Sequence, residues 1–149
     1  MMKLRLMLAD DNAMYREGLC MFLELAPNME VVAEVADGRG VLHEFAQSRP
    51  DVVLMDISMP NLSGIEATRQ LLAIDPKARV IGLSGHVDLS QVAAMIDAGA
   101  LGYVIKGSAG KELRSAILRV SRNQLYFDPA IGIKDLADLT PYMNHTAPL

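Results

Sequence analysis

The sequence predicts an α/β fold built on one open, parallel sheet, and three observations lead to it. Short apolar runs with the composition of β-strands alternate five times with longer runs of helical periodicity. The central run, residues 52–56, is apolar until it ends at Asp56, which is typical of a strand buried on both faces. Five repeats are too few for a closed eight-unit barrel, so we expect the sheet to be open.

The strand-like runs are short and rich in apolar residues, and their predicted ranges are 4–9, 30–36, 51–56, 79–83 and 101–105. Glu34 interrupts the valines of the second run, which favours an edge position for that strand. Right-handed crossovers between consecutive strands give a doubly wound sheet with helices on both faces. The flavodoxin-like (βα)5 order, 2-1-3-4-5, places the second strand at an edge, and we therefore predict this order.

A helical run follows each strand. The first helix is predicted over residues 13–25 and the second over residues 38–47. Met14, Met21, Phe22 and Leu25 recur on one face of the first helix together with Gly18, which predicts a core-facing stripe. The third helix opens at the capping box of residues 63–66 and ends before residues 75–76, the fourth lies between residues 88 and 99, and the fifth follows residue 108.

Composition excludes several classes of protein. The 149 residues carry a net charge of −4, which argues against a general nucleic-acid binder. Cys20 is the only cysteine, so no internal disulfide is predicted and a reducing, cytoplasmic setting fits best. No apolar run approaches the roughly 18 residues that a membrane helix needs, and the start does not resemble a signal peptide. We expect one domain over residues 1–127, followed by a linker or tail over residues 128–149.

Polar residues stand at the ends of four of the five predicted strands, and parallel strands bring these ends to one edge of the sheet. The residues are Asp10 and Asp11, Asp56, Ser84 and Lys106. Three crowded carboxylates repel one another unless cations compensate them, and Mg²⁺ with its preference for oxygen ligands would do so. The arrangement suits phosphoryl transfer to the Asp56 carboxylate. ATP is not expected as the direct donor, because the sequence has no phosphate-binding glycine loop.

These residues identify a resemblance to a known family. Asp10-Asp11, Asp56 with Met59-Pro60 and Gly64, Ser84, and the run 103–106 resemble the receiver domain of bacterial two-component response regulators. The runs at residues 15–19 and 99–103 are similar to the NarL/FixJ (LuxR-type) branch of that family. The resemblance covers about residues 3 to 127.

The resemblance implies a role for each residue. A sensor histidine kinase would supply the phosphoryl group, and the receiver would catalyse its transfer to Asp56. Mg²⁺, with Mn²⁺ as an alternative, would be held by Asp11, Asp56 and the Ser58 backbone carbonyl, with Asp10 assisting through water. Lys106 would pair with the phosphoryl oxygens, Ser84 would hydrogen-bond them, and Tyr103 would turn inward. The fourth helix, fifth strand and fifth helix would then control homodimerisation or transcriptional output.

The sequence also departs from the family in two places. Gly107 stands where many receivers have a proline after the lysine, which makes a cis peptide bond unexpected there. Leu139-Thr140-Pro141 is similar to the start of a helix-turn-helix output domain, but the eleven residues from Leu139 to Leu149 are too few to build one. We therefore expect no output domain and no DNA binding within the printed sequence.

Two other functions compete with this reading. A phosphohydrolase of the haloacid dehalogenase kind would also form an aspartyl phosphate, but it would carry Asp-x-Asp after the first strand and a large cap. A pseudo-receiver would bind partners without being phosphorylated. The adjacent pair Asp10-Asp11 disfavours the hydrolase, and the complete set of acids with Lys106 disfavours the pseudo-receiver.

Overall fold

Six parallel strands form one sheet in the computed structural model, which describes residues 2–108 and 110–143. The strand order is β2-β1-β3-β4-β5-β6, so the predicted order 2-1-3-4-5 is confirmed and extended by one strand. The strands are β1 (Leu4–Ala9), β2 (Met29–Val35), β3 (Val52–Asp56), β4 (Val80–Ser84), β5 (Gly102–Ile105) and β6 (Tyr126–Phe127). The first five lie within one residue of their predicted bounds, and β2, with Glu34, is at an edge as expected.

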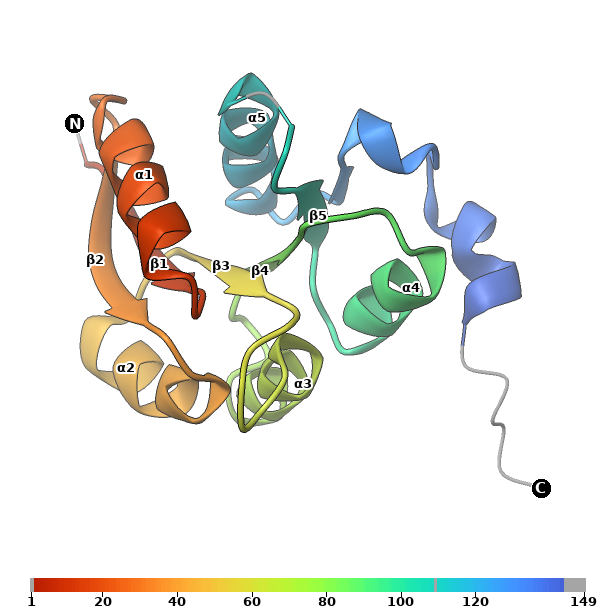
Figure 1. Cartoon of the computed structure of the whole chain (residues 1–149), viewed down its shortest axis with the longest axis horizontal. Helices are drawn as coiled ribbons and strands as arrows, with labels where there is room; N and C mark the ends of the chain where they lie inside the picture. The colour runs from red at the N-terminus through yellow and green to blue at the C-terminus, as the bar shows by residue number, and fades with distance from the viewer. Residues whose placement is uncertain (1, 109, 144–149) are drawn as a thin grey trace.

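Helices cover both faces of the sheet, which gives three layers (Figure 1). One face carries α1 (Ala13–Glu24) and α5 (Gly110–Val120). The other carries α2 (Val41–Ser48), α3 (Gly64–Ile74) and α4 (Leu89–Asp97). A 3₁₀ turn, η1 (Gly38–Gly40), precedes α2. The central strand β3 is fully buried, as its uninterrupted apolar sequence predicts, and it separates two apolar cores.

The predicted core-facing stripe of α1 is wrong. Leu19 and Leu23 are the buried residues of this helix, whereas Met14, Met21 and Leu25 are 82%, 73% and 76% exposed. Two apolar stripes run along α1, and helical periodicity does not distinguish which of them faces the sheet. The leucine stripe packs into the core beneath α1 and α5, and the methionine stripe is left in solvent.

The chain after α5 returns to the sheet and then crosses to the other face. β6 pairs with β5, and two 3₁₀ helices follow, η2 (Pro129–Ile131) and η3 (Leu136–Tyr142). η3 packs against α4, where Leu139 is completely buried in the core on that face. Figure 1 shows these segments running from the β5 edge to α4. The described part of the predicted tail is thus folded onto the domain.

None of the helices in the described residues is both long enough and apolar enough to cross a membrane. All peptide bonds in the described residues are trans, including the bond between Lys106 and Gly107.

Candidate functional site at the carboxyl edge of the sheet

The carboxyl ends of β1, β3, β4 and β5 place the predicted site residues along one edge of the sheet. Asp10 follows β1, Asp56 ends β3, Ser84 ends β4 and Lys106 follows β5. One carboxylate oxygen from each of Asp10, Asp11 and Asp56 lies within 4.8 Å of the other two. Asp10 and Asp56 are buried, whereas Asp11 is exposed and lies on the solvent side of the cluster.

Lys106 joins this acidic cluster from β5. Its Nζ lies 2.6 Å from Asp10 Oδ2 and 3.4 Å from Asp56 Oδ2. The ammonium also lies over the ring of Tyr15, 4.6 Å from its centroid. Burial, helped by the charges of Asp10 and Asp56, raises the pKa of Tyr15 to about 12, so this ring is a neutral phenol at physiological pH. Lys106 is thereby aimed at the two buried carboxylates.

Asp56 lies in an environment of opposing electrostatic effects. Burial raises the pKa of its carboxyl group. The Ser58 N–H, which donates to Asp56 Oδ1 over 3.0 Å, and the Lys106 ammonium both lower that pKa, while the charge of Asp10 raises it. One carboxylate oxygen is thus held by the backbone, and the other faces Lys106. A further cation beside Asp56 would favour its ionised form.

The donor set fits a hard divalent cation. Three carboxylates face a single ammonium, so the cluster keeps an excess of negative charge. Its donors are oxygens, and exposed Asp11 leaves room for the waters that Mg²⁺ retains. The Ser58 backbone lies beside Asp56, but the role of its carbonyl as a ligand stays a prediction.

Ser84 and Tyr103 lie on neighbouring strands beside the cluster. The Ser84 hydroxyl donates to the His86 carbonyl over 2.8 Å and accepts from the His86 N–H over 3.3 Å. Tyr103 is completely buried, and burial raises the pKa of its phenol, an effect that the Ser84 hydroxyl partly offsets. Gly82 makes room for this ring, because a Cβ there would lie 3.0 Å from it. Tyr103 thus lies inside the molecule while Ser84 is bonded to its own loop, and the roles of both residues in a switch stay predictions.

Sequence reasoning missed several residues that shape this edge. Asn12 caps α1, and its N–H donates to Asp10 Oδ1 over 2.8 Å. Asp37 accepts from the side chain of Asn61, whose positive φ of 67° turns the loop that follows β3. Asp128, from the predicted tail, bonds to the turn around Lys106. Asn12 could have been predicted as a helix cap, because asparagine is favoured at the residue before a helix. The contacts of Asp37 and Asp128 join residues far apart in the sequence, so no local pattern indicates them.

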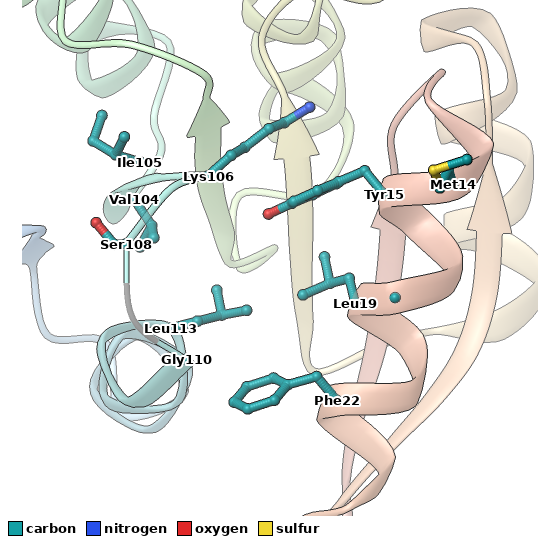
Figure 2. A pocket seen from close by; sticks show the side chains of 11 residues that line it. Met14, Tyr15, Leu19, Phe22, Val104, Ile105, Lys106, Ser108, Gly110 and Leu113 are labelled. Atoms are coloured by element: carbon teal, nitrogen blue, oxygen red, sulfur yellow. The ribbon is translucent and has the colours of Figure 1, made fainter.

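An apolar cavity of about 440 Å³ separates α1 from α5 next to this edge. Figure 2 shows Leu19, Phe22 and Leu113 lining it between the two helices, with the side chains of Lys106 and Tyr15 next to each other at one end. Apart from Lys106, none of the clustered polar residues lines this cavity. The cluster of charged side chains therefore lies at the edge of the sheet and not in this apolar cavity.

Comparisons with known proteins agree with this geometry. The family model described as "Response regulator receiver domain" matches residues 6–118. The transcriptional regulatory protein DegU of Brevibacillus brevis is 36% identical over 129 residues, which cover 87% of this chain and 55% of DegU. LiaR of Bacillus subtilis is 36% identical over 136 residues, which cover 91% of this chain and 64% of LiaR. The chain thus spans between half and two thirds of these relatives.

A solved structure is similar over almost its whole length. The LuxR-family two-component response regulator of Aurantimonas sp. SI85-9A1 has a TM-score of 0.84 and 35% identity, covering 87% of this chain and 93% of that one. The receiver domain of NarL from Mycobacterium tuberculosis has a TM-score of 0.79 and 29% identity, covering 83% of this chain and all of that one.

Proposed function

Because this chain belongs to the response regulator receiver domain family of two-component systems, we propose that Asp56 is its phosphoacceptor. Receiver domains are phosphorylation-activated signalling modules and not metabolic enzymes. The observation that carries the proposal is the buried carboxylate of Asp56, held by the Ser58 N–H on one oxygen and faced by Lys106 on the other. Asp10 is also buried, accepts a backbone N–H and pairs with Lys106, but it follows β1, whereas Asp56 ends the central strand β3.

In the proposed reaction an Asp56 oxygen attacks the phosphorus of a phosphohistidine on a sensor histidine kinase. The P–O bond forms as the P–N bond breaks, and the imidazole leaves with the electron pair and takes up a proton. Lys106 pairs with the phosphoryl oxygens as charge gathers on them. Asp11, Asp56 and the Ser58 carbonyl, with Asp10 through water, would hold Mg²⁺, which would neutralise further phosphoryl charge when bound.

The proposed switch follows from the contacts of Ser84. Its hydroxyl would leave the His86 carbonyl and donate to a phosphoryl oxygen, exchanging a neutral acceptor for a charged one. A charge-assisted hydrogen bond contributes about 1.5–3 kcal/mol, which matches the roughly 1–3 kcal/mol of typical allosteric couplings. Ser84 and Tyr103 would carry the change to α4, β5 and α5. DegU and LiaR are named as transcriptional regulatory proteins. By analogy, the surface of α4, β5 and α5 would control transcription in the cytoplasm, as part of a longer protein.

Homodimerisation is the second part of the proposal, and the described structure favours α1 for it. The exposed Met14, Met21 and Leu25 form an apolar stripe on α1, and such stripes commonly mark interfaces. The face of α4 is already partly covered by η3. We therefore propose that two copies of this chain meet through α1.

The test is the intact mass of the protein after incubation with acetyl phosphate. We expect a gain of one phosphoryl group in the presence of Mg²⁺, no gain with excess EDTA, and no gain in Asp56→Asn. Failure to gain mass with any small donor or kinase would favour the pseudo-receiver. Steady release of phosphate from many phosphate esters would instead favour the hydrolase.

A further inference from the structure

The turn that carries Lys106 is held by few hydrogen bonds of its own backbone. Its backbone bonds are Lys106 N–H to the Ser84 carbonyl, over 2.7 Å, and Ser108 N–H to the Ile105 carbonyl, over 3.0 Å. Gly107 is exposed, and the space around it is open. A glycine next to the lysine leaves the backbone free to adopt many conformations. Something else must fix the point from which the flexible lysine side chain reaches the carboxylates.

Asp128, in the segment directly after β6, supplies that fixed point. It is only 1% exposed, and its N–H donates to the Tyr103 carbonyl over 3.0 Å. Its Oδ2 accepts the Ile105 N–H over 2.9 Å and also the Ser108 hydroxyl. Its Oδ1 accepts the Ala130 N–H over 2.9 Å. One buried carboxyl group is thus bonded to the residue before Lys106 and to the residue two places after it.

We propose that Asp128 is a positioning residue for Lys106, and that it couples the segment after β6 to phosphoryl transfer at Asp56. The inference rests on the proposed function. Lys106 Nζ lies near two carboxylates at once, at 2.6 and 3.4 Å. The lysine stem is flexible, so a fixed backbone reduces the number of positions that its ammonium can take. A displacement of about 1 Å at a reacting centre can reduce a rate by ~100-fold.

Asp128 could instead serve only as the cap of η2, since it accepts the Ala130 N–H. Asp135 provides the matched comparison, because it caps η3 in the same way, through the Ala137 N–H. Both aspartates lie in the segment after β6, but Asp135 bonds to Asp138 and Ala137 and not to the turn around Lys106. Asp128 is buried and Asp135 is exposed, so the comparison concerns the phosphorylation rate and not stability. A role in capping alone predicts no effect of either substitution on that rate, whereas a role in positioning predicts an effect for Asp128 only.

The experiment measures the rate of phosphorylation by acetyl phosphate with Mg²⁺ in Asp128→Asn, Asp135→Asn, Lys106→Ala and the double variant of residues 106 and 128. We expect Asp128→Asn to be slowed by about tenfold or more, and Asp135→Asn to match the parent. In the Lys106→Ala background, Asp128→Asn should have no further effect, because the lysine that it positions is gone. A damaged fold would slow both backgrounds equally.

Amide hydrogen exchange gives a second readout that does not depend on phosphorylation. The Ile105 N–H should exchange faster in Asp128→Asn and at the parent rate in Asp135→Asn. If Asp128→Asn does not fold, Ser108→Ala removes one bond to the same carboxyl oxygen, and its smaller slowing should also vanish in the Lys106→Ala background. Equal slowing in both backgrounds, or a parent-like rate with unchanged exchange, would overturn the inference. A parent that is never phosphorylated would instead refute the proposed function.

Discussion

Gly64 offers a quantitative test of how closely α3 approaches the proposed acceptor. A Cβ at this position would lie 2.0 Å from the Asp56 carbonyl oxygen and 2.8 Å from the Ile57 Cα. Both atoms belong to the backbone, so neither can rotate away. Relief of the closer contact requires the start of α3 and the end of β3 to separate by about 1 Å. Gly64→Ala should therefore move the carboxylate of Asp56 itself.

The expected cost has two parts. Forcing a methyl group into a packed site destabilises a protein by about 1–3 kcal/mol, and each kcal/mol lowers the Tm of a domain of this size by roughly 3–4 °C. A 1 Å displacement of the acceptor should slow phosphorylation by up to about 100-fold. Calorimetry and the time course of the acetyl phosphate reaction measure the two effects on the same sample.

Gly18→Ala is the matched control. A Cβ at Gly18, on α1, meets no atom within 4 Å, so alanine there should leave the rate unchanged. Because alanine favours helix, it should stabilise the protein by about 0.5–1 kcal/mol. If Gly64→Ala is phosphorylated as fast as the parent and melts at the same temperature, the close approach of α3 to Asp56 is wrong.

Three further predictions test separate parts of the account. Leu139→Ala should cost about 2–5 kcal/mol in chemical denaturation, because this side chain is completely buried, whereas the half-exposed Leu136→Ala should stay within about 0.5 kcal/mol of the parent. Lys106→Ala should still be phosphorylated to some extent but should not change its dimerisation in response; a parent-like response in sedimentation would exclude the assigned role. Met21→Glu should weaken the phosphorylated dimer, whereas Ile74→Glu, 72% exposed on α3, should not; equal weakening by both would rule out the α1 interface.

The pattern of apolar and polar residues alone was enough to predict the order of five of the six strands in the sheet. The uninterrupted run of β3 marked the central strand, Glu34 marked the edge, and parallel strands required their polar ends to meet at one place. These features depend on local sequence and on a general rule of topology, and both can be read without coordinates. The gathering of Asp10, Asp11, Asp56 and Lys106 followed from them.

The residue pattern failed where two faces of a helix were both apolar, and where a contact joins residues far apart in the sequence. α1 has two apolar stripes, and only packing against α5 and the sheet decides that the leucines face inward. β6 is only two residues long, too short to show a period. Asp128 lies 23 residues from its partner Ile105, and nothing near it in sequence distinguishes it from an ordinary turn residue before proline.

The central claim, that Asp56 receives the phosphoryl group, is tested most directly by trapping the product. Borohydride reduces an aspartyl phosphate to homoserine, and tandem mass spectrometry of the digested protein then locates the converted residue. After incubation with acetyl phosphate and Mg²⁺, the account predicts homoserine at residue 56 and at no other aspartate. Conversion at Asp10 or Asp11, or a phosphoryl group found on a serine or histidine with Asp56 unchanged, would contradict it.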